Sequence, residues 1–325
     1  MADYKGIQGY SVQVLSSDPP ASEATGQLWY NSTSGKFKLA EAGSGSWSSG
    51  GNVNTARRYI SGVGTSTAGF IFDGNAPGVN YCETYNGTAW TEVADTTSSV
   101  MTRGRAGTST AALASGGVNG GPQAYCESWN GSAWTEVNNI NASKGSMAGA
   151  MGIQTAAIIA GGNPPATNNA AETWDGTCWA EGANINNGRN SGAGVGTTTA
   201  GLIFGGTPPT PSLGPYTESY NGTSWTEVSD LNVGRYGISG SGLQTAALAI
   251  GGGTPTWVNS TEKWDGTSWT EVGNLTTAVR WAGCSTSTGT DTAFNAAGLI
   301  ATPASTNVTE IWADPVYAVK TVTVS

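Results

Sequence analysis

The sequence contains no histidine and carries few charges of either sign. Its 325 residues include 13 Lys and Arg, 22 Asp and Glu and 4 Cys, with a formal net charge of −9 and a pI near 4.5. Metal sites usually draw on closely spaced Cys and His, so we expect no metal and no cofactor. Nucleic acids and anionic membranes are bound by clustered Lys and Arg, so the acidic balance argues against both as partners.

Long apolar runs are absent as well. No stretch approaches the length that spans a membrane, and the start MADYKGIQGY lacks the apolar core of a signal peptide. We therefore expect neither membrane insertion nor secretion through a signal peptide. Strong helix formers are scarce and no long segment has the helical period, whereas Gly reaches 49 residues. The composition predicts an all-β protein.

An eight-residue phrase organises most of the chain. It occurs at Glu83–Trp90, Glu127–Trp134, Glu172–Trp179, Glu218–Trp225 and Glu262–Trp269, with a degraded copy at Glu310–Tyr317. The closing Trp recurs at spacings of 44, 45, 46 and 44 residues, which indicates an array of equivalent modules. Each phrase holds Asn-Gly or Asp-Gly between two strand-like runs, so we expect a tight hairpin with a type I′ turn.

Each module follows one order of segments. A small-residue strand precedes a short apolar run that ends in Gly, then a variable linker, the strand of the E-x-W/Y residues and the strand that begins with the closing Trp. Near-continuous apolar runs are typical of strands covered on both faces. Four strands repeated six times predict a six-bladed β-propeller of four-stranded antiparallel blades, with the Trp side chains packed between blades.

The cysteines do not predict disulfides. Cys82 and Cys126 occupy the same position in consecutive modules, where equivalent atoms lie too far apart to be bridged. Cys178 lies in a turn and Cys284 is isolated. We expect all four to be small, buried, unpaired side chains.

Residues 1–46 differ from the repeats. They contain a strand candidate at GYSVQVLSS and a hairpin at QLWYNSTSGKFKL with Gly35 near its turn. Trp47 matches the closing Trp of a module and should pair with the sheet begun by residues 280–313, closing the ring, although the C-terminal run AVKTVTVS competes for that place. We predict a short N-terminal attachment hairpin over 1–46 and the propeller over 47–325.

The repeat resembles the kelch family. The similarity lies in the Gly-Gly that ends the second strand, the aromatic residue with Asn-Gly or Asp-Gly on the third, and the Trp on the fourth, over about residues 50–317. Module two departs from the pattern, because Val100 and Met101 replace the expected Arg, and module six lacks the double Gly and the closing Trp. Kelch-like propellers include enzymes, adaptors and binding proteins, so the resemblance implies a fold and leaves the function open.

The N-terminal segment resembles a second group of proteins. The run GQLWYNSTSGKFKL followed by GSGSW is similar to a short segment of bacteriophage tail-fibre and other virion structural proteins. This resemblance implies a virion component that is made in the bacterial cytoplasm, contacts other virion proteins through this segment and oligomerises in the particle. A host-surface glycan or protein is the further expected partner.

One basic side chain opens the first strand of most modules. We expect these residues near the mouth of a central channel: Arg57, Lys144, Arg189, Arg235 and Arg280. Each module also carries a Glu, so an Arg–Glu or Arg–backbone contact built once per blade is the favoured interpretation, ahead of anion binding at the mouth.

Catalysis has little support in the sequence. Kelch-like copper oxidases need His ligands and are excluded. Six-bladed sialidases resemble the layout, but a glycosidase needs two carboxylates about 5–9.5 Å apart. No acidic pair outside the repeat stands out, although Asp73 and Asp291 are candidates. We predict no catalytic residues.

The variable linkers between second and third strands are the expected recognition surface. Loops on a rigid scaffold commonly carry binding residues. The residues singled out are Trp257, Thr207, Pro208, Pro209, Leu213 and Pro215. Packing between blades is the competing interpretation of Trp257. The sequence favours a non-enzymatic virion protein, with a carbohydrate-active enzyme of the sialidase type and a soluble kelch-type adaptor as alternatives.

Overall fold

A computed structural model describes residues 12–20, 23–24, 26–75, 80–164, 169–209, 213–286, 289–301, 304–314 and 317–322. The chain divides into two compact units, Met1–Gly45 with Asp314–Ser325, and Ser46–Ala313. The described residues form seven four-stranded sheets, each open, and one short 3-10 helix, η2 (Thr290–Thr292). The all-β prediction is confirmed. The expected count was wrong by one sheet, because the N-terminal segment belongs to a sheet of its own.

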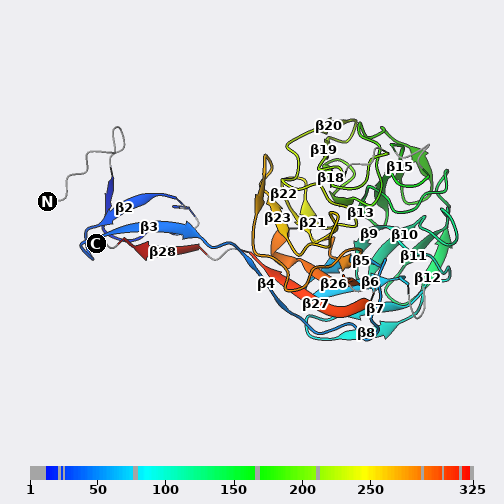
Figure 1. Ribbon diagram of the computed structural model, residues 1–325, viewed down its shortest axis with the longest axis horizontal. Helices are drawn as coiled ribbons and strands as arrows, with labels where there is room; N and C mark the ends of the chain where they lie inside the picture. Colours follow the sequence, from blue (N-terminus) through cyan, green and yellow to red (C-terminus); the bar gives the residue numbers. More distant parts are fainter. Residues whose placement is uncertain are drawn as a thin grey trace. The chain divides into compact units, whose positions relative to one another are not determined.

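Six of the sheets form the second unit and are numbered here in chain order (Figure 1). Sheet 1 consists of β5 (Ser61–Thr65), β6 (Ala68–Phe72), β7 (Cys82–Tyr85) and β8 (Trp90–Val93). Sheet 2 consists of β9 (Gly104–Thr108), β10 (Ala111–Ser115), β11 (Cys126–Trp129) and β12 (Trp134–Val137). Sheet 3 consists of β13 (Gly149–Ile153), β14 (Ala156–Ala160), β15 (Ala171–Trp174) and β16 (Trp179–Glu181). Sheet 4 consists of β17 (Ala193–Gly196), β18 (Gly201–Phe204), β19 (Thr217–Tyr220) and β20 (Trp225–Glu227). Sheet 5 consists of β21 (Ser239–Leu243), β22 (Ala246–Ile250), β23 (Thr261–Trp264) and β24 (Trp269–Glu271). Sheet 6 consists of β25 (Gly283–Cys284), β26 (Phe294–Leu299), β27 (Ser305–Ala313) and β4 (Ser46–Ser49). All neighbouring strands within these six sheets are antiparallel.

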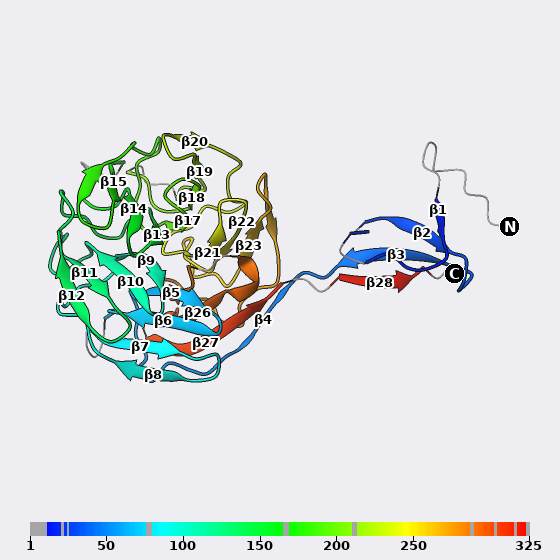
Figure 2. The same cartoon turned by 180° about the vertical axis from the view of Figure 1, so that it is seen from behind.

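The first strands of the six sheets contact one another in a cycle. β5 contacts β9, the contacts continue through β13, β17 and β21 to β25, and β25 returns to β5. Small residues permit this crowding: a Cβ added at Gly62 would lie 2.7 Å from the backbone N of Cys284, and one at Gly194 would lie 2.7 Å from the backbone N of Ala150. The expected inner position of the Gly- and Ala-rich strands is confirmed, and the arrangement is propeller-like (Figures 1 and 2).

Each pair of neighbouring sheets shares one hydrophobic core. Phe70 and Phe72 of sheet 1 pack with Trp134 of sheet 2, and Trp90 of sheet 1 packs with Phe294 of sheet 6. Four further clusters join the remaining neighbours. The expected packing of the closing Trp between sheets is therefore confirmed, and burial of these rings holds the cycle together.

The closing Trp rings also explain two of the cysteines. Trp90 Nε1 donates to Thr309 Oγ1 of the preceding sheet at 2.9 Å. Cys82 and Cys126 take the equivalent position and interact with Trp134 and Trp179 of the following sheets. Burial raises the pKa of both thiols, that of Cys126 to about 11. All four cysteines are free, as expected, but the expected burial was wrong for Cys178, which is exposed in its turn.

The repeated phrase forms the expected hairpin with a different turn. In the first copy Tyr85 pairs with Trp90, which leaves a four-residue loop, and Gly87 has a φ of 92° while Asn86 does not enter the positive-φ region. The Asn86 side-chain oxygen accepts hydrogen bonds from the backbone N–H groups of Thr88 and Ala89, each at 2.9 Å. The type I′ prediction was wrong, because Asn or Asp serves here as a side-chain acceptor.

A strand from the beginning of the chain completes sheet 6. β4 pairs with β27, so that Trp47 lies opposite Trp312 as Trp134 lies opposite Trp129 in sheet 2. Trp47 Nε1 donates to Thr261 Oγ1 of sheet 5 at 3.0 Å. The predicted pairing of the Trp47 strand with the last sheet of the second unit is confirmed. Tyr317 does not close the last module, since it begins a strand of the other unit.

The first unit holds the seventh sheet, of β1 (Gln13–Leu15), β2 (Leu28–Asn31), β3 (Lys36–Ala42) and β28 (Tyr317–Thr321). β1 is parallel to β2, and the other pairs are antiparallel. Its buried core is Ala24, Trp29 and Ala40. The expected strand and hairpin are present, but the C-terminal run adds β28 to this sheet. It therefore neither competes with Trp47 nor belongs to the second unit, where we had placed all of 47–325.

Candidate functional site

Most of the expected basic ring is buried in ion pairs. Arg57 lies 3.1 Å from Glu83, Arg189 lies 2.6 Å from Glu218 and Arg235 lies 2.9 Å from Glu262, with these arginines fully buried. Lys144 is buried too, and its Nζ donates to the Ala170 carbonyl at 2.8 Å. Burial lowers the pKa of Arg57, Arg189, Arg235 and Lys144, and the partner carboxylates oppose this shift. These four side chains do not form an accessible ring at a channel mouth. They make the contact that was the favoured interpretation of the repeat, to a Glu or to the backbone.

The repeated Glu does more than neutralise Arg. The carboxylate of Glu218 accepts hydrogen bonds from the backbone N–H groups of Asn186 (2.7 Å) and Asn187 (3.2 Å) in the preceding inter-sheet loop. Glu310 of sheet 6 accepts from the backbone N–H of Thr276 at 3.0 Å without an ion pair to Arg280 among the described residues. The Glu–backbone contact is therefore the constant part of the repeat, and the basic partner varies.

Arg280 lies one position out of register with the other basic residues. The backbone N–H of Gly206 donates to the Arg235 carbonyl, whereas the equivalent Gly252 donates to Val279, so Val279 is the structural counterpart of Arg235. In sheet 2, the position equivalent to Arg235 is likewise uncharged, because Val100 occupies it. Arg103 supplies the missing cation there and lies 2.8 Å from Glu127.

Arg280 is instead surrounded by aromatic rings. Its guanidinium carbon lies 4.4 Å from the ring centroid of Trp257, 4.1 Å from that of Trp281 and 5.0 Å from that of Tyr236. Its NH1 also donates to the Tyr236 hydroxyl. Tyr59 packs on Trp281 with centroids 4.4 Å apart. We refer to Tyr59, Tyr236, Trp257, Arg280 and Trp281 as the aromatic cluster; all five side chains are half-buried.

Six equivalent residues form a ring just before the first strands. They are Tyr59, Thr102, Ser146, Ser191, Gly237 and Trp281, and their φ values are 60°, 51°, 48°, 56°, 60° and 52°. Backbone hydrogen bonds run between neighbours, including Tyr59 N to the Trp281 carbonyl at 3.1 Å, which joins sheet 1 to sheet 6. Non-Gly residues rarely adopt this left-handed conformation, and the backbone hydrogen bonds that link every neighbouring pair except Thr102 and Ser146 account for it here. We refer to these six residues as the axial ring.

A small pocket of about 60 Å³ lies at the axial ring and contains all six of its residues. Arg105 of β9 also lines it and reaches the opposite side of the cycle, where its NH2 lies 3.3 Å from the Gly240 carbonyl and 2.9 Å from Cys284 Sγ. No carboxylate among the described residues lies within ion-pair distance of Arg105. The pocket therefore combines a cation with the hydroxyls of Thr102, Ser146 and Ser191.

Asp73 is buried between sheets 1 and 2. Its carboxylate lies 3.5 Å from Arg103 Nε and accepts a hydrogen bond from Thr96 Oγ1 at 2.8 Å. Burial raises the pKa of Asp73 to about 7, and the attraction of Arg103 opposes this rise. Arg103 and backbone N–H groups lower the pKa of Glu127 against its own desolvation. The exposed Asp291 lies in η2, packed on β21, β22 and β27, so it does not form an acid pair with Asp73.

The Asp73 carboxyl should make stability depend on pH. Its pKa rises from 3.8 in the unfolded chain to about 7 in the folded one, so folding retains a proton and Asp73's contribution falls as pH rises from about 4 to about 7. We expect Asp73→Asn to lack this component. Guanidinium unfolding at pH 4 to 8 measures it: the stability of wild type relative to the variant should decrease over that range, and a constant difference would contradict it.

The Thr207–Pro215 linker offers less exposed surface than expected. Pro208 is buried, Pro209 is exposed, and Thr207, Leu213 and Pro215 are half-buried; positions 210–212 lie outside the described residues. Hydrogen bonds between Thr207 and Asn190, and from Leu231 N to the Pro215 carbonyl, hold its two ends. Trp257 packs on Arg280 of the next sheet, so the structure brings these two sequence-predicted residues together.

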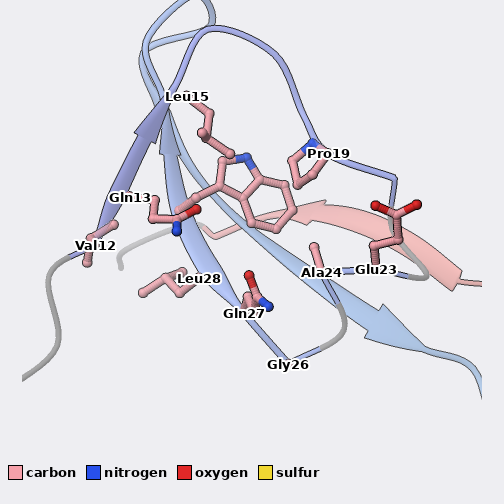
Figure 3. Close-up of a pocket in the computed structure, with 10 residues that line it drawn as sticks. Val12, Gln13, Leu15, Pro19, Glu23, Ala24, Gly26, Gln27 and Leu28 are labelled. Atoms are coloured by element: carbon pink, nitrogen blue, oxygen red, sulfur yellow. The ribbon is translucent and has the colours of Figure 1, made fainter.

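The first unit contains a second, larger pocket of about 630 Å³. Leu15, Pro19, Ala24 and Leu28 contribute to its lining, which also includes Trp29 (Figure 3). Trp29 Nε1 and the Asn31 amide both donate hydrogen bonds to the Asp18 carboxylate. The bond from Asn31 contributes most to lowering the pKa of Asp18, and the bond from Trp29 contributes less. The lining offers apolar contact and no cluster of catalytic groups.

Within the described ranges, no group of three His, Cys, Asp or Glu residues is placed to hold a metal ion. No helix of the described chain is long and apolar enough to span a membrane. A scan against protein-family models found no match to this chain, and a search of curated proteins found none either.

Sequence reasoning missed Tyr59, Tyr236, Trp281 and Arg105. The first three stand at or next to the axial ring, and they are found when the modules are aligned on the closing Trp, which precedes each ring residue by 12 positions, rather than on the basic residue. No sequence signal marks Arg105, because its importance comes from contacts with the opposite side of the cycle.

Proposed function

We propose that the protein is a non-enzymatic bacteriophage virion component of the tail-fibre or appendage type. In this proposal the second unit is a six-bladed, kelch-like propeller that binds a host-surface glycan or protein. The first unit joins it to other virion proteins, and the protein oligomerises in the particle. The N-terminal resemblance to virion proteins supports the location.

The observation that carries the binding role is the aromatic cluster. Trp257 stands in a variable linker and packs on Arg280 of the next sheet, whose guanidinium also lies over the Trp281 ring. Half-buried aromatic rings with a fixed guanidinium offer stacking and hydrogen bonding to a polar ligand. The repeated Arg and Glu side chains, by contrast, are consumed in buried pairs, which weakens the sialidase-type alternative.

Particles that carry Trp257→Ala should assemble normally but adsorb to host cells about tenfold more weakly, because a stacking contact of about 1 kcal/mol or more is lost. Tyr125→Ala is a matched control, since Tyr125 is 48% exposed and lies outside the cluster. Adsorption rate constants measure the effect, with thermal melts to verify folding. Equal adsorption of both variants and wild type would overturn the binding role.

A further inference from the structure

The axial ring keeps one backbone and varies its side chains. Its six φ values lie between 48° and 60°, yet the side chains are two large aromatics, three hydroxyl residues and one Gly. Structural positions of this repeat, such as Glu and the closing Trp, hardly vary. The backbone of the axial ring therefore serves closure, and closure places no demand on which side chains line the pocket.

These side chains are sorted around the pocket. Trp281 and Tyr59 occupy adjacent positions, and the Trp281 ring lies over Gly237, where an added Cβ would meet Trp281 Nε1 at 2.8 Å. Thr102, Ser146 and Ser191 are consecutive on the other side, with the Thr102 and Ser146 hydroxyls 3.3 Å apart. One side of the pocket thus offers an aromatic surface and the other offers hydroxyl groups.

Arg105 adds an uncompensated positive charge. Its NH2 is held by Gly240 and Cys284, and its Nε is buried without a hydrogen-bond partner. Arg103, which also lines the pocket, is neutralised by Asp73 and Glu127. A guanidinium without a carboxylate partner in a confined polar site favours the binding of an anion, since its charge-assisted hydrogen bonds to carboxylate or sulfate are strong.

We propose that the axial pocket binds the carboxylate or sulfate group of an acidic glycan. The acid group enters the pocket of about 60 Å³ and pairs with Arg105, with the hydroxyls of Thr102, Ser146 and Ser191 as further hydrogen-bond partners. The sugar ring itself stays outside the pocket, against its rim. This inference rests on the proposed binding function and names the ligand class. It places the specificity for charge at Arg105 and the remaining contact area at the aromatic cluster.

The test uses the purified full chain on an array of uronate-, sialate- and sulfate-bearing glycans printed beside their neutral counterparts. Binding should be confined to acidic glycans, and titration calorimetry with the best of them should show affinity that falls as salt rises. Arg105→Gln should lower that affinity about tenfold or more. Arg105→Lys should retain part of it, and Lys36→Gln, which removes an exposed charge in the first unit, should leave it unchanged.

Two outcomes would overturn the inference. One is equal binding of acidic and neutral glycans, or an array without binding. The other is an Arg105→Gln protein that melts like wild type and binds acidic glycan equally well. If Trp257→Ala particles adsorb poorly while the array shows no acidic preference, the ligand class fails and the binding function stands. Normal adsorption of those particles together with an empty array would overturn both.

Discussion

A truncated chain that covers residues 51–314 should melt more than about 10 °C below one that covers residues 44–314. The shorter chain lacks β4, so β27 becomes an open edge and the core between sheets 5 and 6 loses Trp47. Removing a buried Trp side chain alone costs about 3–5 kcal/mol. In a domain of this size each kcal/mol corresponds to about 2–4 °C or less in melting temperature.

The pair of truncations isolates β4, because both chains lack the first unit and its β28 strand. Differential scanning calorimetry measures the difference, and Trp47→Ala in the full chain should reproduce a large part of it. Equal melting of the two truncated chains would mean that the six sheets hold together without the N-terminal strand.

Glu218→Met should destabilise the protein more than Arg189→Met, although the two side chains form one buried pair. Breaking a buried ion pair from either side costs about 3–5 kcal/mol. Loss of the carboxylate also removes the acceptor for the backbone N–H groups of Asn186 and Asn187. A buried donor left without a partner adds about 1–3 kcal/mol. Sheet 6 shows the same hierarchy, because Glu310 bonds the backbone there although Val279 replaces the arginine.

Guanidinium unfolding of both single variants and the double variant measures this order. The double variant should cost less than the sum of the single ones, since no uncompensated charge remains buried. An Arg189→Met protein as unstable as Glu218→Met would contradict the assigned role of Glu, and additive costs would contradict the coupling.

The repeated part of the fold could be predicted from the sequence because equivalent segments of each module pack against equivalent segments of the neighbouring modules. Each Glu, Gly and closing Trp acts within its own module or on a neighbouring one, so local sequence carries the information. The alignment of Arg280 with Arg235 failed because the basic side chain is not what the backbone requires. The requirement is the pair of positive-φ positions, occupied by Gly251 and Gly252 in sheet 5 and by Ala297 and Gly298 in sheet 6.

The remaining features depend on contacts between distant segments. An alternating strand such as β28 fits any open sheet edge, so its pairing with β3 could not be read from its own residues. Arg105 reaches Gly240 and Cys284 across the cycle, and its lack of a carboxylate partner is visible only when all six sheets are in place. The aromatic cluster likewise joins residues from three sheets.

The protein content of purified phage particles tests the central claim most directly. Quantitative mass spectrometry of particles separated from lysate should find peptides from both units of this chain at a constant ratio to the major structural proteins. A chain that is abundant in the lysate but absent from purified particles would contradict the assignment as a virion component.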